Sequence, residues 1–293
     1  MISKLMILFY VAVLKLEPME FYYAKLIINP QMNAIIQSKS DLILEGLKTE
    51  KVEMFKNAIY KVVDVDEYKI DGRDYIYGAM IKYKDVEEPI YNEKEKQVQS
   101  SIVENKVLAY ATFVVFLKEN LVLFSEVKEH INRVSFMDRL TNILTMGLQS
   151  KFVDIDINPI SEKYAFYNAI VGMHKIKEIS LTIAPTNPSA DDIIKDLDNQ
   201  LKAQNLKSKK TVYKGKEGGI IMDTEIKSNT VYTDVGYGVG SAIGEDKDGN
   251  QIKLYSKKSD KQRKTYPIDT SRDIGYVIED LDKLLENYEE DNT

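Results

Sequence analysis

Two Asp-Gly pairs constrain the fold of this chain most strongly, because each lies between runs of strand-forming residues. Asp71-Gly72 separates VVDVDEYKI from RDYIYGAMIKY, and Asp248-Gly249 separates GVGSAIGE from QIKLY. Asp-Gly favours the two-residue turn that joins adjacent antiparallel strands. Helical patterns alternate with other β-branched runs along the chain. We therefore expect an α+β fold with antiparallel or mixed sheets, and a ferredoxin-like arrangement is one alternative within that class.

The length of 293 residues exceeds that of one typical domain, so we expect two. An N-terminal α+β domain would cover residues 1–150 and a C-terminal α+β domain residues 151–293, with the boundary at the polar segment GLQSK. The second domain would contain a glycine-rich hairpin and end in a helix. The apolar residues of that helix follow one stripe from Ile274 to Leu285.

Local patterns place the elements of the first half. Strand-forming residues occupy 20–29, and a loosely helical pattern covers 40–60. The charged segment 84–105 forms either a long hairpin arm or a mobile loop. A further helix is expected to begin at Ser135, where Asp138 completes a capping box.

Strands and helices alternate in the second half. The predicted strands cover 152–158, 176–184 and 209–214, the predicted helices cover 161–173 and 189–204, and a hairpin follows at 230–257. Ser189 and Asp192 are expected to cap the second of these helices.

The N-terminal sequence MISKLMILFYVAVLKLEP contains an apolar run from Leu5 to Leu14. This run is shorter than the roughly 20 apolar residues that a membrane-spanning helix needs. It has the length of a signal-peptide core, but no small-residue cleavage site follows it. The natural start is either Met1 or Met19. Because the chain also lacks cysteine, we expect a cytoplasmic protein without a membrane anchor.

The segment GYGVGSAIGEDKDGNQIKLY, from Gly236 to Tyr255, resembles a ligand-binding loop at first sight. A dinucleotide fingerprint would require a third glycine where Ser241 or Ile243 stands, and a helix would have to follow. A calcium loop would require carboxylates at Gly244 and Tyr255. The glycines instead predict a strand with one bare face, which allows another backbone or a ligand to approach closely.

Basic residues concentrate in two segments of a chain whose formal net charge is −6. The candidate nucleic-acid contacts are Lys209, Lys210, Lys214, Lys216, Lys257, Lys258, Arg263 and Lys264. Tyr213, Tyr255 and Tyr266 lie among them, as stacking residues do in proteins that bind single strands. The alternative is that these lysines decorate exposed strands and mainly promote solubility.

A metal site is the competing hypothesis. The run VDIDIN places Asp154 and Asp156 on one face of a strand, where two carboxylates could hold Mg²⁺ for phosphodiester chemistry. Asp64 and Asp66 repeat the pattern in VVDVDEY. An amphipathic strand with one solvated face explains either pair without a metal.

No catalytic residue is assigned. His130 and His174 stand in polar contexts typical of a surface, and no Ser, His and Asp combination is recognisable around them. We therefore expect a binding protein rather than an enzyme, without a cofactor unless the Mg²⁺ alternative holds.

Two runs in the second half, ISLTIAPTNPSADDIIKDLDNQL and GYGVGSAIGEDKDGNQIKLYSKK, carry a family resemblance. They resemble an uncharacterised bacterial domain family found in mobile-element and phage-defence neighbourhoods. The resemblance covers residues 175–267 best, and FYYAKLIINP is a weaker match near the N-terminus. It implies no catalytic residues. It does imply a cytosolic bacterial or phage protein that acts with partners or on nucleic acid.

These observations favour a binding protein, in phage defence under the resemblance, that contacts nucleic acid or a protein partner through its lysine-rich C-terminal half. One alternative is a Mg²⁺-dependent phosphodiester-processing enzyme using Asp154 and Asp156. The other is a structural or assembly protein whose tyrosine-rich strands form an interface. The oligomeric state is open among these alternatives.

Overall fold

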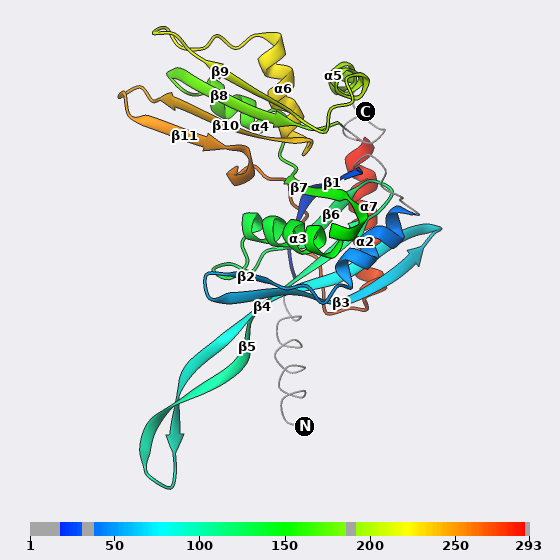
Figure 1. Ribbon diagram of the computed structural model, residues 1–293, viewed down its shortest axis with the longest axis vertical. Coiled ribbons are helices and arrows are strands. Elements are labelled where there is room, and N and C mark those ends of the chain that lie inside the picture. The colour runs from blue at the N-terminus through cyan, green and yellow to red at the C-terminus, as the bar shows by residue number, and fades with distance from the viewer. Residues whose placement is uncertain (1–17, 31–37, 186–191, 291–293) are drawn as a thin grey trace.

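The structure, a computed structural model, describes residues 18–30, 38–185 and 192–290. Within these ranges the strands form two antiparallel sheets, one of seven strands and one of four, and helices pack on both (Figure 1). The α+β fold with antiparallel sheets is therefore confirmed. The apolar run from Leu5 to Leu14 and the predicted capping residue Ser189 lie outside the described residues.

The seven-stranded sheet is built mainly from consecutive hairpins. Its strands are β1 (Phe21–Pro30), β2 (Glu53–Phe55), β3 (Ala58–Ile70), β4 (Arg73–Asn92), β5 (Gln97–Phe116), β6 (Leu121–Ser125) and β7 (Val153–Pro159). Their order is β2-β3-β4-β5-β6-β1-β7. Strands β2 to β6 therefore form a meander, and β1 lies between β6 and β7. Asp71 and Gly72 join β3 to β4, and their positive φ angles of 49° and 79° are those of a type I′ turn.

A hairpin arm and a mobile loop were the two alternatives predicted for the charged segment 84–105, and the structure shows the hairpin arm. β4 and β5 remain paired along it, from Lys84 opposite Lys106 to Asn92 opposite Gln97. Figure 1 shows this end of the hairpin projecting far from the rest of the molecule.

The helix predicted over 40–60 is wrong beyond its first half. Helix α2 (Lys39–Leu47) ends at Leu47, and the chain continues into β2 and β3. Lys56 and Asn57 form the turn between these strands with positive φ angles of 47° and 60°. A right-handed helix has negative φ throughout, so this turn excludes a helix here.

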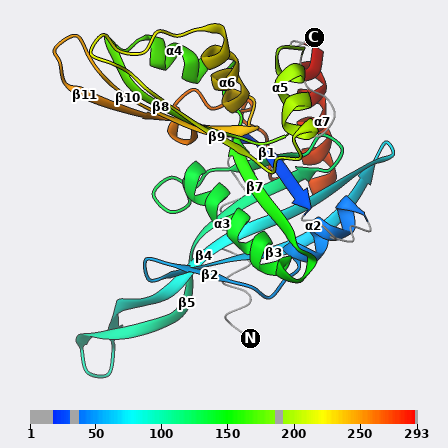
Figure 2. The ribbon, with the colours of Figure 1, turned by 45° about the horizontal axis from the view of Figure 1, so that its top comes forward.

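Helices cover both faces of the seven-stranded sheet (Figure 2). On one face, α2 and α3 (Arg133–Gly147) bury a core that includes Ile43, Phe113 and Phe136. On the other face, α7 (Ile274–Glu290) packs Ile278 and Leu281 against the sheet. The predicted C-terminal helix is therefore part of the first sheet's layers.

The capping box predicted at Ser135 and Asp138 is wrong. Helix α3 begins two residues earlier than expected, at Arg133, and Asn132 is its N-cap. The Asn132 side chain accepts a hydrogen bond from the Ser135 N–H at 2.9 Å. Asn and Ser are equally good caps, so the local sequence offered two compatible starts.

The boundary predicted at residue 150 separates strands that lie in one sheet. β7 pairs with β1 in a register that runs from Ala24 opposite Pro159 to Pro30 opposite Val153. Residues beyond 150 thus complete the seven-stranded sheet and supply α7 on its face. The division into 1–150 and 151–293 stays a prediction about folding units.

The four-stranded sheet carries the remaining elements. They are α4 (Ala165–Val171), β8 (Lys175–Ile183), α5 (Asp192–Ala203), β9 (Lys209–Lys214), α6 (Thr224–Asp234), β10 (Gly238–Glu245), β11 (Gln251–Tyr255) and the short 3₁₀ helix η2 (Ser256–Lys258); a second 3₁₀ helix, η1 (Gln149–Lys151), precedes β7. The strand order is β11-β10-β8-β9. The chain order β8-α5-β9-α6-β10-β11 differs from the β-α-β-β-α-β order of a ferredoxin-like fold. The hairpin predicted over 230–257 is correct from β10 onward, but α6 occupies its first residues.

Because the glycines of β10 have no side chains, an aromatic ring packs directly on this strand. A Cβ atom on Gly240 would lie 2.5 Å from Cε1 of Phe166 and 2.8 Å from Cδ2 of Leu181. Phe166 is the second residue of helix α4 and is 2% exposed. The bare face of this strand is thus filled by α4, and it offers no room to a ligand.

We expect Gly240→Ala to lower the free energy of unfolding by about 1–3 kcal/mol, because the added methyl overpacks a filled core. Gly218→Ala is the matched control, since nothing lies within 4 Å of a Cβ built there. Urea unfolding measures both. Equal stabilities of the two variants would contradict the close contact between α4 and β10.

A buried carboxyl joins α6 to α4. Asp234 is 1% exposed, and its Oδ1 accepts a hydrogen bond from the Phe166 N–H at 3.0 Å. Its Oδ2 has no hydrogen-bond partner among the described residues. Burial raises the pKa of Asp234 to about 7, although backbone hydrogen bonds from Phe166 and Tyr167 oppose the shift.

This raised pKa makes stability depend on pH. The folded state favours protonated Asp234, so the contribution is complete below the unfolded pKa near 3.8 and is lost as pH rises through about 7. Between pH 5 and pH 8, we expect the wild type to lose about 3 kcal/mol more than Asp234→Asn. Urea unfolding across this range measures the difference, and parallel profiles for the two proteins would contradict the assignment.

Candidate nucleic-acid interface

The four-stranded sheet has one face packed on helices and one face open. Alternate residues of a strand point to opposite faces. Ile179, Leu181 and Ala242 lie in the core formed with α4 and α6, as do Tyr213 and Leu254 at its margin. The residues between these positions therefore face the other way, and Figure 2 shows α4 and α6 together on one side of the sheet.

We call this second surface the open face and define it by the register of the strands. Three rows cross the sheet from β11 to β9: Lys253, Ile243, Glu178 and Lys214; Tyr255, Ser241, Ser180 and Val212; and Val239, Thr182 and Lys210, where β11 has already ended. The outer positions are exposed and the central ones half-buried. Three strand spacings of about 4.8 Å put the two lysine-bearing edges roughly 14 Å apart.

The lysines of the open face are not held in ion pairs within the described part of the chain. Lys210, Lys214 and Lys253 are exposed and form no ion pair among the described residues. Tyr255 is 47% exposed, and the Lys258 ammonium lies 5.2 Å from the centre of its ring. Glu178 is the acidic side chain in the three rows and is half-buried. A flat surface with cations at both edges and an aromatic ring can bind a polyanion.

Three of the residues predicted to contact nucleic acid already interact with other side chains of the protein. Lys257 pairs with Asp138 of α3 at 3.3 Å, and Lys264 pairs with Glu20 at 2.7 Å. The Arg263 guanidinium lies 5.4 Å from the centre of the Tyr23 ring on β1. These groups hold the segment after β11 to the seven-stranded sheet, which makes them weaker candidates for a ligand.

The remaining predicted lysines surround the open face without all belonging to it. Lys209 alternates with Lys210 on β9, so it points to the helix side and is half-buried. Lys216 lies just beyond the strand and is exposed. Lys253 is the first residue of the second basic segment, 253–264. Period-two alternation in QIKLY places it on the open face, because Ile252 and Leu254 face the core and leave Lys253 and Tyr255 outside.

Asp154 and Asp156 lie together on β7, each beside a lysine from a basic segment. Lys207 pairs with Asp154 at 2.6 Å. Desolvation raises the pKa of Asp156, while the charges of Lys257 and Lys207 lower it. An ammonium competes with a divalent cation for the same carboxylate oxygens, so this donor set fits Mg²⁺ poorly. The Mg²⁺ alternative stays a prediction with less structural support than the open face.

The second aspartate pair is broken by a bulge. The register of β3 against β4 shifts between Val63 and Asp66, and Asp64 has a positive φ of 53°. Asp64 instead accepts a hydrogen bond from the Tyr110 hydroxyl at 2.9 Å. Residues 18–30, 38–185 and 192–290 contain no group of three or more His, Cys, Asp or Glu side chains suited to a metal. His130 and His174 are both exposed, as their polar contexts predict.

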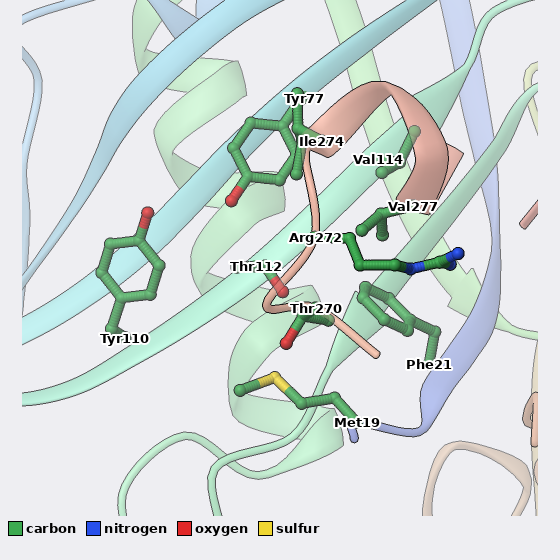
Figure 3. A pocket seen from close by; sticks show the side chains of 10 residues that line it. All are labelled: Met19, Phe21, Tyr77, Tyr110, Thr112, Val114, Thr270, Arg272, Ile274 and Val277. Atoms are coloured by element: carbon green, nitrogen blue, oxygen red, sulfur yellow. The ribbon is translucent and has the colours of Figure 1, made fainter. Parts of the chain in front are cut away.

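A small pocket lies on the α7 side of the seven-stranded sheet (Figure 3). Its volume is about 50 Å³, and its polar groups are chiefly the hydroxyls of Tyr77, Tyr110, Thr112 and Thr270. Burial raises the pKa of Tyr77 to about 12, so this hydroxyl stays protonated. Arg272 at the rim pairs with Asp280. The volume suits a few water molecules, and no nucleophile or free charge points into the pocket.

Comparison with known proteins identifies a family but no activity. No curated protein matches this chain. No helix in the described part of the chain is long and apolar enough to cross a membrane. The sequence model of the family described as "Domain of unknown function (DUF4747)" matches residues 20–281, which include both sheets. This match confirms the resemblance to an uncharacterised domain family, and the phage-defence setting stays a prediction. The chain belongs to the DUF4747 family.

Proposed function

We propose that this protein binds single-stranded nucleic acid on the open face. The observation that carries the proposal is the register: it aligns Lys214 with Lys253, and Val212 with Tyr255, across one uncovered surface. Phosphates of a strand that crosses the sheet would meet a lysine at each edge. Its bases would lie over the small, half-buried side chains of Ser180 and Ser241.

A single strand suits this surface better than a duplex. A protein reads duplex DNA by inserting a helix or a β-ribbon into a groove. The open face is a flat sheet, and its exposed ring, Tyr255, suits an unpaired base. Four-stranded sheets bind single-stranded RNA in this manner, with aromatic side chains stacking on two or three bases.

The remaining parts of the functional hypothesis rest on the sequence. We expect a cytoplasmic location from the cysteine-free composition and a phage-defence setting from the family resemblance. A protein partner on the same lysine-rich surface is the alternative occupant. Oligonucleotide binding decides between the two, because a protein-binding surface need not retain a single strand in dilute salt.

Charge reversal at the two edges should abolish binding. We expect the triple variant Lys210→Glu, Lys214→Glu, Lys253→Glu to bind a labelled 20-nucleotide oligo(dT) or oligo(U) at least tenfold more weakly than wild type at low salt. Fluorescence anisotropy measures the affinity. For the wild type, log K should fall with log salt with a slope of about −2, since each phosphate contact contributes about −0.7.

The matched control reverses the charge of three exposed lysines outside the four-stranded sheet, with the substitutions Lys118→Glu, Lys128→Glu and Lys283→Glu. It changes the net charge of the protein by the same amount. It should keep its affinity within about twofold. A wild type without salt-dependent binding would overturn the proposal. An equal loss in both triple variants would show a general charge effect instead of a defined surface.

Stacking on Tyr255 gives an independent prediction. Tyr255→Leu should weaken binding of the single strand about fivefold to a hundredfold, because one stacked base contributes about 1–3 kcal/mol. The salt slope should not change, and Tyr255→Phe should bind like wild type. Tyr266→Leu is the control, since that tyrosine is 80% exposed but lies outside the open face. Equal effects of Tyr255→Leu and Tyr266→Leu would contradict stacking at this site.

A further inference from the structure

The arm, residues 84–105, is a two-stranded ribbon with no third strand. β3 pairs with β4 only as far as Tyr83, and β6 pairs with β5 only from Phe113 to Phe116. Within the described chain the outer edges of both arm strands are therefore unpaired. Isolated two-stranded ribbons are marginally stable in water, and unpaired edges with apolar side chains promote association.

Four apolar side chains of the arm lie in one stripe on one face of the ribbon, while Ile90, which is 49% exposed, points to the other face. Tyr91 stands opposite Val98, Pro89 lies one step nearer the body on the same face, and Ile102 follows one step further. Tyr91, Val98 and Ile102 are 58%, 68% and 67% exposed. We call these four residues the arm stripe. Single exposed apolar residues are common, but their alignment on one face of a projecting ribbon is typical of an interface.

The arm is acidic. Residues 84–105 contain six carboxylates and three lysines, a net charge of −3. Glu87 lies in the arm stripe's own face, opposite Ile102, and Glu93 follows at the turn. Neither forms an ion pair among the described residues.

A second apolar cluster stands beside the root of the arm and has the opposite charge around it. Val52 and Met54, which we call the hairpin patch, lie on one face at the start of the β2–β3 hairpin and are 37% and 76% exposed. Phe55 points to the opposite face, where the Arg139 guanidinium lies 4.1 Å from the centre of its ring. Lys51 and Lys56 flank this patch along the chain, are exposed, and make no ion pair within the described part of the chain. The nearby carboxylates are already paired, Glu50 with Lys61 and Glu53 with Arg139.

Both surfaces lie at the same end of the molecule. Ile59, next to the β2–β3 turn, stands opposite Tyr83, where the arm begins. Figures 1 and 2 agree in placing β2 beside the point where β4 and β5 leave the sheet. A two-fold axis at this end could therefore bring each surface of one copy onto the complementary surface of another.

We propose that the arm stripe of one copy packs on the hairpin patch of a second copy, so that two chains clasp each other by their arms. The contact joins apolar surface to apolar surface and an acidic rim to a basic rim. It is made twice in a two-fold dimer, with each chain giving one arm and receiving one.

The test is the oligomeric state of the full chain, measured by sedimentation velocity from about 1 to 100 μM. We expect a dimer for the wild type and a monomer for Tyr91→Ser with Val98→Ser. Because both side chains are exposed, thermal unfolding should show that this variant remains folded. A wild type that stays monomeric at 100 μM would overturn the proposal.

A charge-swap experiment identifies the occupant. Lys51→Glu with Lys56→Glu, and separately Glu87→Lys with Glu93→Lys, should each weaken dimerisation at least tenfold. All four substitutions in one chain should restore it to within about threefold of wild type, whereas Lys118→Glu with Lys128→Glu should have no effect. Failure of the combined variant to recover would show that the arm docks on something other than the hairpin patch, and the proposal would be wrong.

Discussion

The whole structure depends on the pairing of β1. Its first half is bonded to β6 and its second half to β7, so it closes the meander and adds the last strand of the seven-stranded sheet. Its side chains enter three cores: Phe21 lies on the α7 side, Leu26 on the α3 side, and Ile27 in the cluster shared with β8 and α5. The segment after β11 is tied to the same strand by the hydrogen bond from Tyr23 N–H to the Arg263 carbonyl at 3.1 Å. One strand thus connects the two sheets and both ends of the described chain.

This connection divides the basic residues into two groups with different tasks. Lys207, Lys257 and Lys264 pair with carboxylates of β7, α3 and the residue before β1. They hold the four-stranded sheet and the segment behind it against the larger sheet. Lys210 and Lys214, which stand on the far edge of the small sheet, form no ion pair among the described residues, although Glu178 lies opposite Lys214. Lysines that are close together in the sequence therefore differ in role. Some form ion pairs that stabilise the structure and others are exposed without an ion pair, and only the fold distinguishes the two groups.

The elements predicted correctly from the sequence are those that local residue patterns determine. The Asp71-Gly72 turn and β9 followed from turn chemistry and alternation. The prediction of a helix past Leu47 failed because the positive φ angles at Lys56 and Asn57 are not specified by hydrophobic spacing. Helix α6 was missed for a related reason: TEIKSNTVYTD is rich in β-branched residues and is buried from Asn229 to Asp234, so tertiary packing, not propensity, makes it helical.

The candidate site shows the same limit. Alternation in QIKLY predicts that Lys253 and Tyr255 share a face, but it does not say which strand lies beside them. Long-range pairing through β10 and β8 is needed to align that face with Lys210 and Lys214. The pairing of β8 with β10 spans the whole of α5, β9 and α6, and no local pattern encodes it.

The acidic arm and the basic open face lie far apart in the molecule, and this arrangement links the two proposed surfaces. The arm is acidic and lies at one end, while the open face is basic and belongs to the sheet at the other (Figure 1). Clasped arms would therefore leave both open faces uncovered. A strand long enough to reach both would bind the second face as an intramolecular step, which raises the overall affinity without any new contact. Weak binding by one small sheet face would then suffice, because the proposed dimer would supply two of them.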